Sequence, residues 1–443
     1  MTTAGRSRAA RETAAGRAAR ALRPGHRLEL LKGGSALFEA LVTAVDAARS
    51  EVLLETYIFD FNGAAVAVAE SLERAATRGV DVRVVVDGFG TGDIPAEWQR
   101  RWKAAGLSWR IYHPARGWRL LLPTRWRRMH RKLCVVDGRT AFCGGINLLD
   151  DFVDPNHGAL EQPRFDFAVR VTGPLVADAH DTMTRLWLRM QVAREAGQQD
   201  ARSTLRAVQE AAGAGTDMGD AAMTAGQLRL GEHVGQVGDA TDGADPAASG
   251  VLAGLVLRDN LRFRRRIEHF YRYAIREAKS EIIIANAYFV PGLHLQRALV
   301  AAARRGVRIT VLLQGRYEYF MQHHTSRALY GVMLEAGIEI IEYAPSFLHA
   351  KVAVFDGIHG AIATVGSSNL DPLSLLLARE ANVFVRDNAF AAELRDHLLE
   401  AIRTAGQRVE PAHHHRRSFA KRMLAWVAQT LMRFALFATR NRY

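Results

Sequence analysis

The chain has 443 residues, of which 49% are hydrophobic and 24% charged, so it is long enough for two or three domains with ordinary cores. Its only cysteines are Cys134 and Cys143, which excludes a disulfide scaffold. The first 30 residues contain seven arginines and no continuous apolar run, so we expect no secretory signal. This composition favours an intracellular, reducing location.

Positive charge is concentrated in three segments of the chain. The formal net charge is +13, from 59 Lys and Arg against 46 Asp and Glu. The basic excess lies in 1–27, 100–132 and 416–443, and the remainder of the chain is net acidic. Such patches indicate an anionic partner, either nucleic acid or an anionic membrane surface.

In chain order, apolar segments alternate with alanine-rich stretches. Residues 52–59 read VLLETYIF, 65–79 read AVAVAESLERAATRG, and 82–86 read VRVVV. The same order returns with EIIIANAYFV at 281–290 and a second short apolar run at 307–313. Strands that alternate with helices predict a parallel or mixed sheet with helices on its faces.

The two series are an internal duplication, because the words SE and RGV recur at matching places about 230 residues apart. We therefore expect two related α/β lobes. Between them, a stretch of small, polar and glycine-rich residues is typical of a linker. The predicted organisation is a basic mobile arm at 1–27, an N-terminal lobe at 28–195, a flexible linker or insertion at 196–252, a C-terminal lobe at 253–410 and a basic amphipathic tail at 411–443.

Each copy carries one histidine motif. The chain reads HRKLCVVD from His130 and HAKVAVFD from His349, so both have the form His-x-Lys followed by four residues and Asp. In a strand, residues i and i+2 share a face, which places each histidine beside Lys132 or Lys351. An imidazole beside a fixed cation suits attack on a phosphate. The alternative, in which each histidine is a core residue and each lysine lies on the surface, does not account for the repetition.

Further along each copy come GGIN (144–147) and GSSN (366–369). Their glycines permit close backbone approach, and polar side chains in them can hydrogen-bond phosphate oxygens. The candidate phosphate-binding residues are Asn147, Asn369 and Ser368.

These motifs resemble those of the phospholipase D superfamily, whose members carry two HxKxxxxD motifs. Flanking words such as AFCGGINLLDD, LHAKVAVFDG and TVGSSNLDP are similar to those of the shorter bacterial cardiolipin synthases, which lack N-terminal transmembrane helices. The resemblance covers 28–195 and 255–400. It implies two pseudo-twofold-related lobes, each a mixed β-sheet flanked by helices, with the active site at the lobe interface. One departure is a longer gap between the motif Asp and the glycines in the second copy, which predicts a longer hairpin turn.

The resemblance also implies a transphosphatidylation from phosphatidylglycerol to a second phospholipid, either phosphatidylglycerol or phosphatidylethanolamine. His130 is expected to form a phosphohistidine and His349 to act as acid and base, and the reversed assignment stays open. The two lysines and the asparagines supply charge stabilisation, so no metal and no cofactor is expected. A hydrolytic phospholipase D giving phosphatidic acid and a phosphatidylserine synthase are alternatives of the same chemistry. A phosphodiesterase-type nuclease is an alternative from a different enzyme class, and a non-catalytic nucleic-acid-binding protein is one without catalysis.

Carboxylates complete the expected site. Each imidazole needs an orienting partner, and we expect Asp166 to hold His130 and Glu380 to hold His349. The remaining motif members, Asp137 and Asp356, are grouped with the catalytic motif residues, although closure of the strand turn is their expected role. Cys134 and Cys143 are expected to face each other across the first hairpin, as a buried thiol pair rather than a disulfide.

Two sequence features bear on whether the anionic partner is nucleic acid or a membrane: the aromatic residues before His130 and the C-terminal tail. Rings interleaved with arginines before His130 could stack on bases or lie at lipid headgroups. Residues 418–443 can form a helix with one narrow polar line and a wide apolar face, too short to span a bilayer but suited to its interface. Packing of that helix on a lobe or on another protomer is the alternative. The five tryptophans concerned are Trp98, Trp102, Trp109, Trp118 and Trp126.

We therefore expect an anionic phospholipid membrane surface and phosphatidylglycerol as partners, no nucleic acid, and a peripheral location at the cytoplasmic face of the bacterial cell membrane. A histidine run at 413–415 could bind a metal, but no further ligand set accompanies it.

Overall fold

The computed structural model describes residues 22–114, 127–154, 157–198, 250–258, 263, 265–316, 327, 329–371 and 378–410. The arm up to residue 21, most of the predicted linker, Trp118, Trp126 and the tail from residue 411 lie outside the described residues. Contacts divide the chain into two units, Met1–His180 with Gly250–Tyr443, and Asp181–Ser249. Both histidine motifs belong to the first unit. Of the second unit, only the part of helix α5 (Leu175–Gln198) that runs from Asp181 to Gln198 is described.

One mixed sheet runs through both halves of the first unit. The N-terminal half contributes β1 (Arg23–Lys32), β2 (Glu51–Thr56), β3 (Asp81–Asp87), β4 (Ser108–Tyr112), β6 (Lys132–Val136), β7 (Thr140–Gly144) and β10 (Phe167–Thr172). The C-terminal half contributes β11 (Val251–Arg258), β12 (Ala278–Asn286), β13 (Arg308–Gln314), β14 (Glu339–Tyr343), β15 (Lys351–Gly357), β16 (Ile362–Gly366), β17 (Ala378–Arg386) and β18 (Gly406–Arg408).

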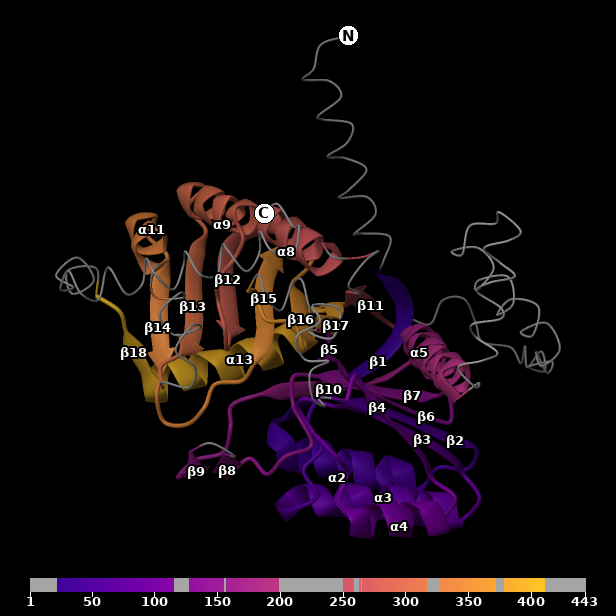
Figure 1. Cartoon of the computed structure of the whole chain (residues 1–443). Coiled ribbons are helices and arrows are strands. Elements are labelled where there is room, and N and C mark those ends of the chain that lie inside the picture. Colours follow the sequence, from indigo (N-terminus) through magenta and orange to yellow (C-terminus); the bar gives the residue numbers. More distant parts are fainter. Residues whose placement is uncertain are drawn as a thin grey trace, which may run out of the picture. The chain divides into compact units, whose positions relative to one another are not determined.

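The order of these strands repeats in reverse about the middle of the sheet. It runs β18-β14-β13-β12-β15-β16-β17-β11-β1-β10-β7-β6-β2-β3-β4 (Figure 1). In each half three successive strands are parallel: β3 pairs with β2 and β4, and β13 pairs with β12 and β14. The strands β6 and β15, next to β2 and β12, are antiparallel to them. The predicted fold class, two related α/β lobes with a mixed sheet, is confirmed.

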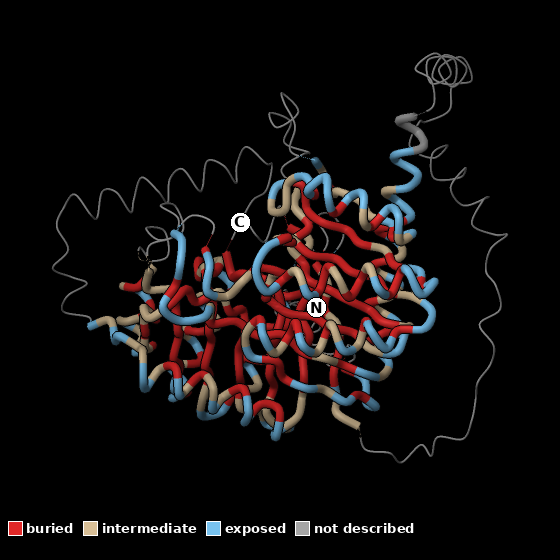
Figure 2. The backbone as a smooth tube through the Cα atoms, turned by 90° about the horizontal axis from the view of Figure 1, so that it is seen from below, coloured by how far each residue is buried: buried red, intermediate tan, exposed pale blue. Residues whose placement is uncertain are grey.

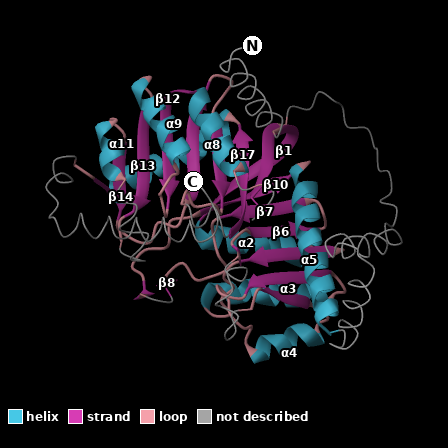
Figure 3. Cartoon of the chain, turned by 45° about the horizontal axis from the view of Figure 1, so that its top comes forward, coloured by secondary structure: helices cyan, strands magenta, loops and turns pink. Residues whose placement is uncertain are grey.

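Helices cover the sheet because their apolar residues recur at helical spacing. In α3 (Val66–Thr77) the buried positions include Val68, Leu72, Ala75 and Ala76, which form one stripe. Figure 3 shows helices in front of and behind the strands, and Figure 2 shows the buried strands beneath half-exposed helices. The remaining helices of the first unit with a full set of described residues are α2 (Gly33–Asp46), α4 (Ala96–Ala104), α8 (Arg266–Glu277), α9 (Leu293–Arg304), α11 (Tyr330–Glu335) and α13 (Asn388–Ala405).

Each half has its own hydrophobic core. The N-terminal core includes Trp98 and Trp102 on α4, and Trp109 packs against it. The rings of Trp98 and Trp102 therefore face the core, because α4 turns them towards α3 and the sheet, where Phe59 and Phe61 meet Trp102. Trp109, on β4, is partly buried. Among the described helices, none is long and apolar enough to cross a membrane.

Two predicted boundaries are shifted in the structure. Residues 23–27, expected in the mobile arm, form the start of β1, where Arg23 lies opposite Ala253 of β11 and Arg27 opposite Thr172 of β10. Helix α5 continues to Gln198, past residue 196, where the linker was expected to begin. In the first case the order comes from pairing with strands far along the chain, which local composition does not reveal.

The two motif hairpins differ as expected. Asp137 and Gly138 have φ values of 51° and 60° and form a tight turn between β6 and β7, the conformation that Asp-Gly favours in hairpins. In the second copy Phe355 pairs with Ile362, so the turn is longer, as predicted. Cys134 pairs with Phe142 and Leu133 pairs with Cys143, which places the two thiols on opposite faces of the sheet. The expectation that they face each other is wrong; both are free and buried.

Candidate active site

Backbone pairing clamps each histidine to the opposite half of the molecule. The short strand β5 (Arg128–Met129) pairs in parallel with β17, and the His130 amide donates to the Arg379 carbonyl at 3.0 Å. In the other half, Phe165 bridges to Leu348, and the His349 amide donates to the Phe165 carbonyl at 3.0 Å. The two motifs therefore meet at the junction between the halves.

This exchange decides which carboxylate meets which imidazole. Nδ1 of His130 lies 3.1 Å from Glu380, and Nδ1 of His349 lies 2.7 Å from Asp166. Sequence analysis chose the right carboxylates but paired each with the histidine of its own copy, and that pairing is wrong. The reason is the backbone pairing: the residues just before each histidine pair with a segment of the other half, directly beside that half's carboxylate. With Nδ1 occupied in this way, Nε2 of each ring is the atom left for chemistry.

Two buried lysines accompany the imidazoles. The side chains of Lys132 and Lys351, the first residues of β6 and β15, donate to the carbonyls of His130 and His349, two residues earlier in each motif. Lys132 is 6% exposed and Lys351 is fully buried. Burial, reinforced by the charge of Lys351, lowers the pKa of Lys132 to about 7. An anionic ligand would restore its charge.

The two histidine–carboxylate pairs differ in electrostatics. Burial and the Lys132 charge lower the pKa of His130, while Glu380 opposes that shift. Burial and both lysines hold the pKa of His349 well below its ordinary value. Burial pushes the pKa of Glu380 upward, but the charge of His130, its hydrogen bond and Arg258 keep the pKa below the ordinary range. For Asp166, burial prevails over the lysines and raises the pKa to about 7.

The candidate phosphate-binding residues lie after β7 and β16. The Asn147 carbonyl oxygen Oδ1 accepts from the Ile58 amide at 3.3 Å. Asn369 is 2% exposed, and its Oδ1 is buried without a hydrogen-bond partner among the described residues. Ser368 directs its hydroxyl at the Asn369 carbonyl, at 3.4 Å, rather than at either pair. Its neighbour Ser367, which sequence analysis did not select, donates to Glu380.

The two motif aspartates lie at the far end of their strands. Asp137 accepts from the amides of Ser50 and Glu51 at 2.8 and 3.1 Å, and Asp356 accepts from those of Ser280 and Glu281 at 2.7 and 3.0 Å. Asp137 lies five positions after Lys132, about 16 Å along the strand. The prediction that these two aspartates belong with the catalytic residues is therefore wrong. They organise the start of β2 and β12 instead.

Sequence analysis missed three residues that shape the histidine environment. Asp87 accepts from the Met129 amide at 2.8 Å, and its counterpart Gln314 accepts from the Leu348 amide at 3.3 Å, so both hold the residue before a histidine. The ring of Tyr57 lies 4.8 Å from that of His130. All three lie at or just after the carboxyl end of a parallel strand. Because α/β proteins place their sites at that edge of the sheet, this position is the signal that could have identified them.

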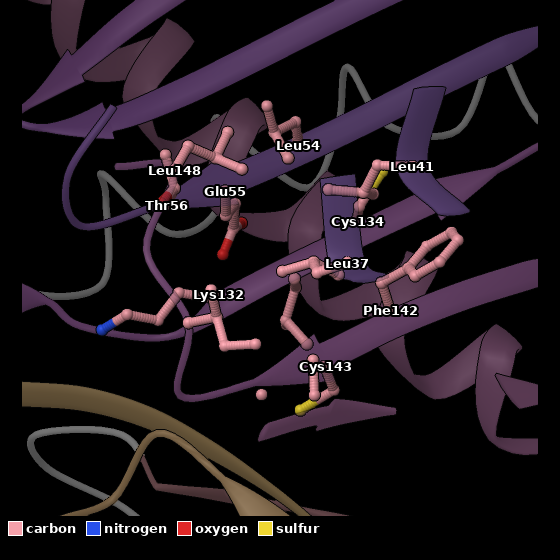
Figure 4. A pocket seen from close by; sticks show the side chains of 14 residues that line it. Leu37, Leu41, Leu54, Glu55, Thr56, Lys132, Cys134, Phe142, Cys143 and Leu148 are labelled. Carbon is pink, nitrogen blue, oxygen red and sulfur yellow. The ribbon is translucent and has the colours of Figure 1, made fainter. Parts of the chain in front are cut away.

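A cavity of about 20 Å³ lies beside β6 in the N-terminal core (Figure 4). Leu37, Cys134 and Phe142 line it, with Glu55 and the stem of Lys132. It has room for about one water molecule, so it is a packing gap rather than a substrate site. Across the described residues, no group of three His, Cys, Asp or Glu side chains is placed to hold a metal ion.

The chemistry of this arrangement follows from its parts. Two imidazoles can present Nε2 to a common atom, one as nucleophile and one as proton carrier, while two ammonium groups and an amide lie beside them. Such a set suits an anionic, phosphorus-centred reaction, because the lysine side chains are buried and held in position before a ligand arrives, and an anion favours their charged form.

Comparisons with known proteins agree with this reading of the fold. A family model described as "Cardiolipin synthase, PLD-like domain" matches residues 41–160 and 271–402. Cardiolipin synthase B of Shigella flexneri is 35% identical over 88% of this chain and 83% of its own length. Cardiolipin synthase A of Pseudomonas putida is 26% identical over 86% of this chain and 69% of its own. The crystal structure of phosphatidylserine synthase from Haemophilus influenzae shares the fold, with a TM-score of 0.62, 12% identity, and coverage of 97% of this chain and 98% of that one.

The fold is thus that of the phospholipase D-like proteins, with two copies of the domain in one chain. The chain belongs to the cardiolipin synthase family with a phospholipase D-like domain.

Proposed function

We propose that this protein is a cardiolipin synthase that transfers a phosphatidyl group from phosphatidylglycerol to a second phospholipid through a phosphohistidine. The observation that carries the proposal is the pair of histidines, each held at Nδ1 by a carboxylate of the other half and flanked by Lys132 and Lys351. The names of the relatives support the choice of lipid substrate over other phosphodiesters.

In the first step, Nε2 of His130 attacks the phosphorus of phosphatidylglycerol. The bond from phosphorus to the headgroup oxygen breaks, and His349 protonates the departing glycerol. In the second step, the hydroxyl of the acceptor lipid gives its proton to Nε2 of His349, its oxygen attacks phosphorus, and the phosphorus–nitrogen bond breaks. The lysines and Asn369 stabilise the phosphoryl oxygens, and Asn147 serves the same oxygens from the other half.

The electrostatics of the second pair suit the proton-carrying role. With the Asp166 pKa near 7 and that of His349 depressed, the pair can hold one proton on the carboxyl and another on Nε2. When Nε2 gives up its proton, the carboxyl proton moves to Nδ1, and His349 becomes a neutral base for the second step.

Membrane association follows from the proposed substrates. Both lipids reside in a bilayer, so the enzyme is peripheral to the cytoplasmic face of the cell membrane and binds its anionic surface. The basic segments and the amphipathic pattern at 418–443 support this location. Deletion of 418–443 is expected to move the protein from the membrane fraction to the soluble fraction, whereas an unchanged distribution would contradict an anchoring tail.

Product analysis tests the activity. Purified protein incubated with phosphatidylglycerol micelles is expected to release glycerol and form cardiolipin, as detected by mass spectrometry. Addition of phosphatidylethanolamine tests the second lipid: its headgroup ends in an amine and has no free hydroxyl, so cardiolipin formed with release of ethanolamine would identify it as a phosphatidyl donor to phosphatidylglycerol. Formation of phosphatidic acid alone would establish a hydrolase instead, and cleavage of single-stranded DNA without lipid turnover would establish a nuclease.

A further inference from the structure

The pseudo-twofold symmetry of the two halves is broken around one histidine pair. Glu380 and Asp166 occupy equivalent places, because the amides of Ser367 and Gly145 donate to the residues that follow them, Ala381 and Phe167, each at 3.0 Å. The surroundings of the two carboxylates can therefore be compared position by position.

Glu380 is supported on two sides. Ser367 donates its hydroxyl to Oε2, and Arg258, which lies opposite Glu380 in the β11–β17 pair, places NH2 3.8 Å from Oε1. Both Arg258 and Glu380 are buried, at 1% and 0% exposure. A buried carboxylate held by a buried guanidinium and a hydroxyl remains ionised.

Asp166 has glycines at both matching positions. Gly33 takes the place of Arg258 and donates its amide to the Asp166 carbonyl at 2.9 Å. Gly145 takes the place of Ser367, and a Cβ there would lie 2.4 Å from Asp166 Oδ1. The carboxylate thus occupies the space that a serine side chain would need. A serine at position 145 would require Asp166 to move.

The neighbours of the two imidazole rings also differ, and again the side of His130 has the additional contact. Tyr57, the residue after β2, lies with its ring 4.8 Å from the His130 ring and 5.4 Å from Lys132 Nζ. The Tyr57 carbonyl accepts from the Thr91 hydroxyl at 3.0 Å, which fixes its backbone. The residue after β12, at the matching place beside His349, is Ala287, which has no π face to offer. A π face attracts a cation.

We propose that Tyr57, Ser367 and Arg258 form a one-sided shell of positioning residues that fits His130, and not His349, to carry the phosphatidyl group. This inference rests on the proposed function and deepens it. When Nε2 of His130 bonds to phosphorus and the headgroup oxygen departs with its electron pair and a proton from His349, Nδ1 keeps its own proton. The His130 ring then carries a positive charge, which the ionised Glu380 and the face of Tyr57 stabilise. The division of labour is therefore encoded outside the two HxKxxxxD motifs.

The test uses the full chain and a phosphatidyl ester of p-nitrophenol, whose leaving group departs without a proton, so that the burst of nitrophenolate reports His130 alone. Tyr57→Leu is expected to slow the burst about tenfold, the size of a desolvated cation–π contact, and Tyr57→Phe to stay within about twofold of wild type. Arg258→Met is expected to shift the acid limb of the burst pH profile to higher pH by about one unit or more. Arg258→Lys is expected to restore the position of that limb. Arg74→Met, which removes an exposed arginine paired with Asp46 on the surface, is the matched control.

A second measurement locates the intermediate. The reaction of wild type with phosphatidylglycerol labelled at phosphorus is quenched in alkali, and the labelled peptide is expected to contain His130. Label on His349, or bursts of Tyr57→Leu and Arg258→Met equal to wild type while cardiolipin is still made, would overturn the shell and leave the proposed function standing. Absence of both a burst and cardiolipin in wild type would overturn both.

Discussion

Nδ1 of His349 lies 2.7 Å from Oδ2 of Asp166, a residue 183 positions earlier in the chain and in the other half of the molecule. His130 and Glu380 form the reciprocal contact across the same junction. Neither half therefore contains a complete histidine–carboxylate pair. The junction between the halves is part of the site itself.

The exchanged pairing is open to direct measurement. Asp166→Asn and Glu380→Gln are each expected to reduce turnover by about 10² to 10⁴-fold, because the imidazole loses the partner that sets its tautomer. In nitrogen-15 spectra of histidine side chains, Glu380→Gln should shift the resonances of His130, and Asp166→Asn those of His349. A shift of His349 in Glu380→Gln would contradict the observed geometry.

Lys132 is expected to cost stability. Its folded pKa is about 7 against 10.5 in the unfolded chain, so between these values the unfolded state binds more protons and the free energy of unfolding rises with pH. Lys132→Met should therefore increase the free energy of unfolding at pH 7, by about 1 to 3 kcal/mol, while abolishing activity. Urea titrations at pH 7 and pH 9 measure this, and the advantage of the variant should shrink at pH 9. Equal destabilisation at both pH values would contradict the assignment.

Binding of an anion should be accompanied by proton uptake. Inorganic phosphate near the lysines raises the pKa of Lys132 and of Asp166 from about 7, so both groups gain protons at pH 7.5. Calorimetry in two buffers with different ionisation enthalpies is expected to show uptake of a fraction of a proton or more per site. Lys132→Met should reduce that number, and Arg74→Met, at the exposed surface pair, should not.

Asp137 and Asp356 are expected to support the fold rather than the reaction. Their pKa values are depressed, because backbone amides and a serine hydroxyl oppose the effect of burial, so their stabilisation is present above pH 3.8 and is lost as pH falls further. Asp137→Ala should lower the free energy of unfolding at pH 7 by about 1 to 3 kcal/mol, since several donors lose their acceptor. The kcat of the folded enzyme should remain within about threefold. A loss comparable to that of His130→Ala would show that the aspartate takes part in catalysis.

The two thiols should be inert in the native protein. Burial raises the pKa of Cys134 and of Cys143 to about 12, and they lie on opposite faces of the sheet. A thiol reagent is expected to label two cysteines only after unfolding, and mobility on a non-reducing gel should match that under reduction. Rapid labelling of the native state would contradict their burial.

The repeated words and the two HxKxxxxD motifs were enough to predict the two-lobed α/β fold and the residues that meet at the junction. They did not predict the partners, because the pairing of β5 with β17 and of Phe165 with Leu348 joins segments that are far apart in sequence. Within one copy, Asp166 follows His130 and is the nearer candidate. Trp98 and Trp102 misled for a related reason, since the basic residues between and beside them in α4 gave a buried face the composition of an exposed one, although Arg101 stacks on the Trp98 ring and pairs with Glu73 of α3. Tyr57 and Arg258 carry no motif and become visible only when the copies are superposed by strand register.

The central pairing of β1 with β11 suggests how such an enzyme arose. Two identical subunits related by a dyad would share this sheet, but each active centre would then see the same neighbours from either side. Joining the copies into one gene removes that constraint, because Tyr57 can then change without Ala287, and Arg258 without Gly33. In a single chain, the surroundings of the two histidines can therefore change independently of each other.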